Sequence, residues 1–343
     1  MKKDWILGIL LVLVIFFGIS YLLSSNSEGD KTFIRALDTT PEEFERKVLN
    51  EGVQLEPLND SSKLYSPAQV RIDRDHLYIN DFSVFTIYKF DSDGNLLDSL
   101  ETTRGRGPGE VQHLTDFSIR NDTIWVADSQ NMRVLAYSMK TGENIHNFIL
   151  EHRPMRIANF SDGFVVLWLG ADSLFSTFDF KGNETATFGS IVEDQFQHQI
   201  SLGGTIRSNG KDRFVFMPFY ASLIYHYTTD GELLNILKAP DGVQFPAARR
   251  DGAVTYAPDF SFMRDGYMDF NDNLYIYTRV PEEKNSGNDK VSFIDKYNLQ
   301  TASYVESIKI NQHYSSFMYN PYERKLYATD MQKAYIEQLN ENF

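Results

Sequence analysis

The run Ile124-Trp125-Val126-Ala127-Asp128 decides the fold, because apolar segments of the same kind recur along the chain. A short apolar run rich in β-branched and aromatic residues is typical of a buried β-strand. The first run starts at residue 77 and the last at residue 326, and successive starts lie 41–60 residues apart. The other five runs are Leu77-Tyr78-Ile79-Asn80-Asp81, Val165-Val166-Leu167-Trp168-Leu169, Phe214-Val215-Phe216-Met217-Pro218, Leu274-Tyr275-Ile276-Tyr277-Thr278 and Leu326-Tyr327-Ala328-Thr329-Asp330. One supersecondary unit is therefore repeated six times.

Each repeated unit contains several strands. Most of the runs are followed by a second strand and then by a turn with glycine, such as Asp93-Gly94 or Asp230-Gly231. Glycine adopts the positive φ of a tight hairpin, and an outer strand follows at Leu96–Leu100 and at Leu233–Leu237. Four-stranded units that repeat every ~40–50 residues are typical of propeller blades. The sequence predicts an all-β chain in which residues 53–343 form a six-bladed β-propeller with four-stranded antiparallel blades.

The two ends of the propeller are predicted to share the last blade. Strands near Tyr314–Tyr319, Lys325–Thr329 and Ala334–Leu339 leave this blade one strand short. We expect Val53–Leu58 to supply the fourth strand, because this pairing closes the ring without a bare sheet edge. The alternative for Met331–Phe343 is a helix, since its apolar residues also fit one helical face.

The N-terminal segment predicts a membrane anchor. Residues Trp5–Leu23 contain no charged side chain and follow Lys2 and Lys3. As a helix this segment would be ~28 Å long, close to the ~30 Å hydrocarbon core of a bilayer. The two lysines favour a cytoplasmic N-terminus, so we expect a single-pass protein with its propeller on the extracytoplasmic, periplasmic side. The alternative is cleavage as a signal peptide near Ser24–Ser27.

Residues 24–52 are predicted to form a polar linker and a short helix. Thr40, Pro41 and Glu43 provide a capping residue, a proline at the first helical position and a glutamate three residues after the cap. Gly52 is a plausible stop signal. We therefore expect a helix over Pro41–Asn50, between an anchor at residues 1–23 and a propeller that starts at residue 53.

Composition excludes several classes of function. The chain has no cysteine, which rules out a disulfide scaffold, thiolate metal sites and cysteine catalysis. Its net charge of -14 argues against a nucleic-acid partner, because such proteins need a basic surface to displace counterions from phosphates. With 42% hydrophobic and 23% charged residues, the chain can bury a large core and is not intrinsically disordered.

A glycine-rich loop between the first and second units is the most unusual local sequence. It reads Arg104-Gly105-Arg106-Gly107-Pro108-Gly109-Glu110. Backbone amides freed by glycine can hold an anion, and the two arginines add positive charge. Candidate ligand-binding residues are therefore Arg104, Arg106, Gly107 and Glu110. The alternative is a tight connector whose charged side chains pair with neighbouring blades.

Two insertions lengthen the repeat, at Ala239–Asp259 and Pro281–Lys290. Long irregular loops on a rigid scaffold often carry binding residues. The first insertion contains Arg249 and Arg250 in an otherwise acidic chain, and we take both as candidate ligand-binding residues. The alternative is that both insertions are solvated decoration.

The sequence contains no recognisable metal or catalytic motif. The acidic turns Asp91–Asn95 and Asp269–Asn273 do not complete an EF-hand. The seven histidines have no H-E-x-x-H spacing, and no G-x-S-x-G nucleophile elbow is present. We expect no cofactor, and the sequence identifies no catalytic residue. The alternative is a metal-dependent hydrolase or lyase, in which side chains from several innermost strands hold a divalent cation such as Ca²⁺ in the central channel.

Parts of the second unit resemble a known family. The Arg104–Glu110 loop, Asp116-Phe117, the Ile124–Asp128 run, Asn131 and Arg133-Val134 are similar to bacterial six-bladed β-propeller proteins related to NHL-repeat and TolB-like propellers. The resemblance extends roughly from residue 53 to the end of the chain, and it implies an exported or membrane-anchored propeller but no reaction. From the anchor, the repeats and the missing catalytic motif, we expect a membrane-tethered, non-catalytic binding or scaffold module for a protein or carbohydrate-like ligand.

Overall fold

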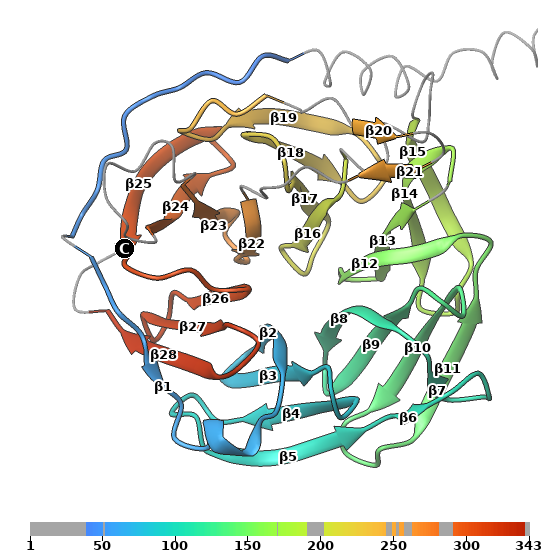
Figure 1. Ribbon diagram of the computed structural model, residues 1–343. Coiled ribbons are helices and arrows are strands. Elements are labelled where there is room, and N and C mark those ends of the chain that lie inside the picture. The colour runs from blue at the N-terminus through green and yellow to red at the C-terminus, as the bar shows by residue number, and fades with distance from the viewer. Residues whose placement is uncertain are drawn as a thin grey trace, which may run out of the picture.

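The computed structural model describes residues 39–50, 52–169, 171–190, 202–244, 249–251, 254–256, 263–280 and 291–339. Six four-stranded antiparallel sheets surround a central axis (Figure 1). In each sheet, the apolar run identified in the sequence forms the second strand from the axis. The predicted six-bladed β-propeller is therefore confirmed.

Three blades form the first half of the ring, and their strands follow one another from the axis outward. Blade 1 contains β2 (Pro67–Asp73), β3 (His76–Asp81), β4 (Thr86–Phe90) and β5 (Leu96–Glu101). Blade 2 contains β8 (Leu114–Arg120), β9 (Thr123–Asp128), β10 (Arg133–Ser138) and β11 (Asn144–Ile149). Blade 3 contains β12 (Arg153–Asn159), β13 (Gly163–Leu169), β14 (Ser173–Asp179) and β15 (Glu184–Ser190).

The second half of the ring has the same order, except that its last blade takes a strand from the start of the propeller. Blade 4 contains β16 (Gly204–Ser208), β17 (Arg213–Pro218), β18 (Leu223–Thr228) and β19 (Leu233–Lys238). Blade 5 contains β22 (Met263–Met268), β23 (Asn273–Arg279), β24 (Ser292–Asn298) and β25 (Ser303–Ile310). Blade 6 contains β26 (Ser316–Asn320), β27 (Lys325–Thr329), β28 (Ala334–Gln338) and β1 (Glu56–Pro57).

The ring closes by the predicted pairing of the two chain ends. In blade 6, Glu56 of β1 pairs with Ile336 of β28, and Pro57 pairs with Tyr335. The C-terminal segment is thus a strand over Ala334–Gln338, and the helix considered as an alternative is wrong for these residues. A strand here satisfies the backbone groups of β27, which would otherwise form an open sheet edge.

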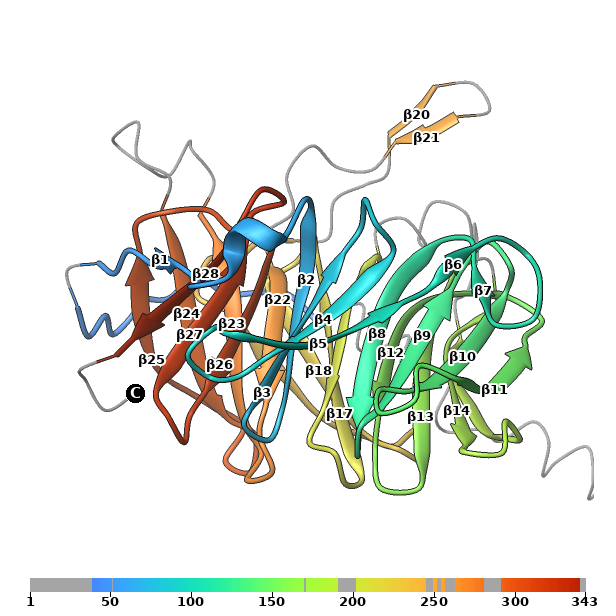
Figure 2. The same cartoon turned by 90° about the horizontal axis from the view of Figure 1, so that it is seen from below.

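The two faces of the propeller differ in the loops that they carry. The connector face carries the connections between blades and the loops between the second and third strands. It includes the 3-10 helix η1 (Ser61–Lys63), the pair β6 (Thr103–Arg104) and β7 (Glu110–Val111), and the hairpin of β20 (Arg249–Asp251) and β21 (Val254–Tyr256) (Figure 2). The hairpin face, on the opposite side, carries the tight turns that join the first strand to the second and the third to the fourth.

The core lies between neighbouring blades. Trp125 of blade 2 packs on Phe164 of blade 3, with ring centroids 5.2 Å apart. The ring centroids of Phe175 in blade 3 and Phe216 in blade 4 lie 5.3 Å apart. Because both faces of each sheet are covered in this way, the second strands are apolar on both sides, which explains their continuous apolar runs.

The expected helix over Pro41–Asn50 is wrong. Residues 39–50, which we call the N-terminal strap, contain no helix and lie along the outer edge of blade 5. Val48 forms a parallel bridge with Ser307, and Val53 forms one with Ile310 of β25. Hydrogen bonds to the free edge of a sheet override the local capping signal, because a short isolated helix is marginally stable. The strap therefore packs against the propeller and is not a free linker.

Two other predictions lie outside the described residues. These are the membrane anchor at residues 5–23 and the insertion at Pro281–Lys290. Over the ranges that the structure describes, no helix has both the length and the apolar character needed to cross a membrane.

Candidate functional site

The innermost strands place one residue of each blade at an equivalent position around the axis. Each of these residues pairs with the fifth residue of the second strand of its blade, as Gln69 pairs with Asn80 in blade 1. The positions two residues further on point to the same side of each strand and line the same channel. The first ring consists of Gln69, Asp116, Arg156, Thr205, Asp265 and Ser316. The second ring consists of Arg71, Ser118, Ala158, Arg207, Tyr267 and Met318.

Four charged side chains from these rings meet at the centre, and we call Arg71, Asp116, Arg207 and Asp265 the central charge cluster. Arg71 Nη2 lies 2.5 Å from Asp116 Oδ1, and Arg71 Nη1 lies 3.5 Å from Asp265 Oδ2. Arg207 Nη2 donates to Asp265 Oδ1, and Arg207 Nη1 lies 4.0 Å from Asp116 Oδ2. Each carboxylate therefore faces both guanidinium groups. All four residues are at most 7% exposed.

The remaining blades complete the hydrogen bonds of this cluster. Ser316 of blade 6 donates to Asp265 Oδ2 at 2.5 Å, and the Ile157 amide of blade 3 donates to Asp116 Oδ2 at 3.3 Å. Burial opposes ionisation of Asp265, but the charges of Arg207 and Arg71 outweigh it and lower the pKa of Asp265 below its ordinary value. The two arginines and the hydrogen bond from Ser316 thus stabilise the ionised form of Asp265.

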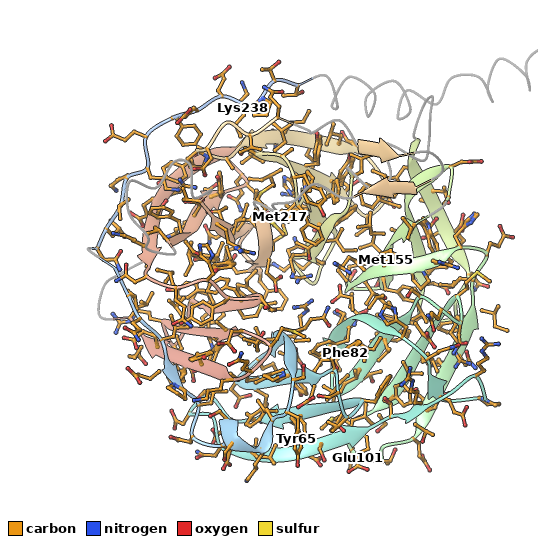
Figure 3. The ribbon with its side chains drawn as sticks, in the orientation of Figure 1. Tyr65, Phe82, Glu101, Met155, Met217 and Lys238 are labelled. Atoms are coloured by element: carbon orange, nitrogen blue, oxygen red, sulfur yellow. The ribbon has the colours of Figure 1, made fainter. Side chains whose placement is uncertain are left out.

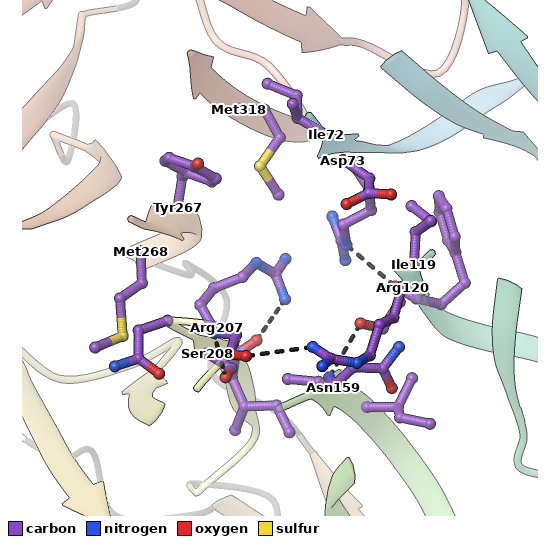
Figure 4. Close-up of a pocket in the computed structure, with 18 of the residues that line it drawn as sticks. Ile72, Asp73, Ile119, Arg120, Asn159, Arg207, Ser208, Tyr267, Met268 and Met318 are labelled. Carbon is purple, nitrogen blue, oxygen red and sulfur yellow. Dashed lines mark hydrogen bonds between the residues drawn. The ribbon is translucent and has the colours of Figure 1, made fainter. Parts of the chain in front are cut away.

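The central charge cluster separates two cavities along the axis. The cavity on the connector face measures about 430 Å³ and the one on the hairpin face about 400 Å³. Both cavities include Arg71 and Arg207 in their walls, so these two guanidinium groups form the partition. Figure 4 shows the hairpin-face cavity, with the Arg207 side chain extending toward the middle of the view.

The mouth on the connector face combines aromatic and cationic side chains. Phe82 of the β3–β4 loop is 43% exposed and lies against His113, with ring centroids 6.2 Å apart. Across the mouth, the Arg156 guanidinium lies over the ring of Phe219 at 5.4 Å. Phe82 and Met155 lie near the central opening in Figure 3, and both line this cavity. These groups provide contact surface and fixed positive charge.

The predicted glycine-rich loop lies on the connector face, and its own glutamate occupies the concavity that its backbone forms. The Gly107 amide donates to Glu110 Oε2 at 2.7 Å, and a side chain at Gly105 would collide with the same carboxylate. Arg133 Nη1 donates to the Gly107 carbonyl at 3.1 Å. The loop is therefore tied to blade 2 by its own polar groups.

The two arginines of that loop point to different partners. Arg104 lies over the ring of Phe85 at 5.3 Å, and Arg106 Nε donates to Gln112 Oε1 at 3.0 Å. Both arginines are exposed. That they bind an external ligand stays a prediction.

Arg249 and Arg250 lie in β20, on the hairpin that follows blade 4 in the chain and projects from the connector face (Figure 2). This hairpin and the glycine-rich loop share a face but are separated around the rim (Figure 1). The start of the predicted insertion belongs to the fold itself, because Asp241 pairs with Arg46 of the strap. The structure thus places all six candidate residues on one face without gathering them into one site.

The acidic turns of the sequence form ordinary hairpins. Asp91 Oδ1 accepts backbone hydrogen bonds from Asp93 and Asn95 at 3.0 and 2.8 Å. Asp269 Oδ1 accepts equivalent bonds from Asn271 and Asn273. In the part of the chain that the structure describes, no three histidine, aspartate or glutamate side chains converge as metal ligands.

Sequence reasoning did not identify the central charge cluster. Its members lie 45 to 194 residues apart, and only ring closure brings them together. An alignment of the six innermost strands by register would reveal charged residues at positions that face the axis.

Comparison with known proteins agrees with this architecture. Residues 53–250, more than half of the chain, match the model of the family DUF5128, described as a 6-bladed beta-propeller. No curated protein matches the chain.

Several solved structures share the fold at low sequence identity. A member of the duf4221 family from Bacteroides vulgatus has a TM-score of 0.57 at 12% identity and covers 87% of this chain and 100% of its own. The RRP9 WD40 repeats have a TM-score of 0.55 at 8% identity, with the same coverage. A virginiamycin B lyase from Staphylococcus aureus, solved with quinupristin, has a TM-score of 0.51 at 12% identity and covers 81% of each chain. Identities this low support the fold alone. With the family match, they lead to one conclusion: the chain belongs to the DUF5128 family of six-bladed β-propellers.

Proposed function

We propose that the protein is a non-catalytic binding module that is tethered to the membrane by residues 5–23 and carries its propeller on the extracytoplasmic side. Its partner surface is the connector face, and we propose that the partner is a protein. The uncharged segment at Trp5–Leu23 and the preceding lysines support the tether and its orientation.

One observation carries the binding proposal, namely an exposed apolar patch on the connector face. Its members lie in loops of the three adjacent blades 6, 1 and 2, and two of them, Phe82 and Met331, line the channel mouth. We call them the connector patch: Tyr65, Phe82, Val84, Met132 and Met331, which are 40–73% exposed. A cluster of exposed large apolar side chains marks an interaction surface, and aromatic residues, methionine and arginine are enriched in protein interfaces.

The charges of the channel favour binding over catalysis. Asp116 and Asp265 are each held by arginines and by hydrogen-bond donors, so neither can take a proton from a substrate without losing an ion pair. Across the mouth from Phe82 of the connector patch, the Arg156 guanidinium lies over the ring of Phe219 and provides a cationic anchor of the kind found in interface hot spots. Arg104, Arg106, Gly107 and Glu110, with Arg249 and Arg250, form the rim of the same face and are proposed as peripheral contacts.

A photo-cross-linking amino acid at position 82 tests this proposal in the full-length chain, in membranes of cells that express it. We expect one adduct of defined mass, and we expect Arg156→Ala to reduce its yield ~10-fold or more, as for the loss of an interface hot spot. Leu97 is the matched control position, because it is 52% exposed but lies on the outer strand β5 of blade 1.

The proposal fails if the same adduct forms equally from position 97, or if position 82 gives none. An adduct that forms in full yield despite Arg156→Ala would also contradict it, because the mouth would then play no part in recognition.

A further inference from the structure

The cavity on the hairpin face contains three polar side chains that have no hydrogen-bond partner among the described residues. The side-chain amide nitrogen and oxygen of Asn159 are buried and have no hydrogen-bond partner among the described residues. The residue is 6% exposed. Within the described ranges, the Asp73 carboxylate has no side-chain hydrogen bond and no ion pair within 4 Å, and the Tyr267 hydroxyl has no hydrogen bond. All three residues line the same cavity of about 400 Å³.

The other polar groups of this cavity are already engaged. Arg71 and Arg207 belong to the central charge cluster. Asn209 donates to Asp272 Oδ1 at 2.9 Å and accepts backbone hydrogen bonds through its oxygen. Arg120 Nη1 donates to the Gly210 carbonyl at 3.3 Å. The three unpaired side chains therefore stand apart from the rest of the wall.

These three side chains face the axis from different directions. Asp73 ends β2 of blade 1, Asn159 ends β12 of blade 3, and Tyr267 lies in β22 of blade 5. They thus come from alternate blades, and Figure 4 shows them on different sides of one cavity. A molecule that fills the cavity would lie against the wall that all three residues form.

An unpaired amide inside the protein is unfavourable, because buried polar groups normally have a partner. The Asn159 amide offers one acceptor and two donor hydrogens, the Asp73 carboxylate accepts, and a phenol does both. Hydroxyl groups match this set, since each one donates and accepts without carrying charge.

Charges of both signs line the cavity, so neither an anionic nor a cationic ligand matches the whole wall. An anionic ligand would meet the Asp73 carboxylate, while a cationic ligand would meet the guanidinium groups of Arg74 and Arg120 in the same wall. Apolar side chains, among them Ile72, Ile119 and Met318, also line the cavity and can cover the C–H surface of a ring. The volume lies within the ~300–1,000 Å³ range of small-molecule sites.

We propose that the hairpin-face cavity binds a neutral, hydroxyl-rich ligand, a saccharide unit or a polyol, through Asn159, Asp73 and Tyr267. This site lies on the face opposite the connector patch and does not rest on the proposed protein-binding function.

Isothermal titration of the full chain in detergent tests this site with five probes. Glucose, N-acetylglucosamine and myo-inositol are neutral, and glucuronate and glucosamine are their charged counterparts. We expect at least one neutral probe to bind with a Kd of ~1 mM or lower. The charged probes should bind at least ~10-fold more weakly than this neutral probe. Asn159→Leu should weaken binding of the neutral probe ~10-fold or more, because the substitution removes both the donor and the acceptor of the side-chain amide.

The variant keeps the experiment interpretable. Leucine is close to asparagine in size, and replacing an unpaired buried amide by an apolar group should raise the melting temperature. Asp73→Asn is the second variant, and Phe82→Ala at the other mouth is the matched control that should bind as the parent does.

Three outcomes would overturn the proposal. One is that no neutral probe binds at ~100 mM, far above the Kd expected even for a weak site. The second is that binding survives Asn159→Leu, and the third is that Phe82→Ala abolishes it, which would place the ligand at the other mouth. Failure here leaves the cross-linking result at position 82 untouched, so the two proposals are tested separately.

Discussion

Replacing Asp265 by asparagine is expected to lower the free energy of unfolding by ~3–5 kcal/mol, the usual cost of removing one partner of a buried ion pair. Asp265 is 3% exposed and accepts from Arg207, from Ser316 and from the backbone amide of Phe317. The substitution leaves Arg207 buried without its principal counter-charge. Denaturant unfolding of the two proteins measures the difference.

The matched control for this substitution is Asp93→Asn. Asp93 also pairs with a cation, Lys325 at 2.8 Å, but its side chain is 72% exposed. Exposed pairs contribute only ~0–1 kcal/mol, so the same chemical change should have a small effect there. Equal losses for the two variants would contradict the assignment of the central charge cluster as the element that joins the blades at the axis.

The pH dependence of this contribution has a definite sign. The pKa of Asp265 is lowered in the folded protein, so its ionised form stabilises the fold above the ordinary aspartate pKa. This stability is lost as the pH falls from that ordinary value through the lower pKa of the folded protein. We therefore expect the difference between parent and Asp265→Asn to shrink under acid conditions.

The second large effect is expected from Arg46→Met in the N-terminal strap. Arg46 is inserted between two carboxylates, since Nε donates to Asp295 Oδ1 at 2.9 Å and Nη1 donates to Asp241 Oδ1 at 2.9 Å. Asp295 is fully buried, and the Arg46 guanidinium also lies over the ring of Phe293 at 4.3 Å. Methionine keeps much of the side-chain length but leaves both carboxylates without this cation.

The expected loss is ~3–5 kcal/mol, because two buried charges lose a shared counter-ion. Lys47→Met is the control, since the neighbouring Lys47 pairs with Glu306 but is 67% exposed. The measurement is again denaturant unfolding, with protease cleavage near residue 45 as a second readout of strap release. If Arg46→Met is no less stable than Lys47→Met, the strap does not hold blade 5 in the way described.

Much of the propeller was predictable from the sequence because its second strands are covered on both faces. That burial requires continuous apolar runs, and Leu77–Asp81 and Ile124–Asp128 both form the second strand of their blade. Ring closure was also predictable, since without β1 the last blade would end in a bare edge at β28.

The strap was not predictable from local signals. Thr40, Pro41 and Glu43 match a helix start, but the decisive contacts are made with residues about 200–260 positions away. Such contacts determine the conformation here because the local helix preference is worth little in a segment of this length.

The candidate site was only partly predictable. The glycine-rich loop stands out in the sequence, yet the position of the Glu110 carboxylate over Gly105 and Gly107 depends on the fold of the loop. Asp116 and Asp265 lie in different blades, and their spacing in the sequence says nothing about their shared contact with Arg71. Residues that meet at the axis of a ring leave no short motif.

Elemental analysis of the purified full chain tests the central claim, a binding propeller whose channel carboxylates are neutralised by arginine. The protein is prepared without chelator or affinity-column metal, in parallel with a double variant in which Asp116 and Asp265 are both replaced by asparagine. The account predicts calcium, magnesium and zinc well below one equivalent per chain in the parent protein. About one equivalent of any of these metals, lost in the double variant, would contradict it and favour a metal-dependent hydrolase or lyase in the channel.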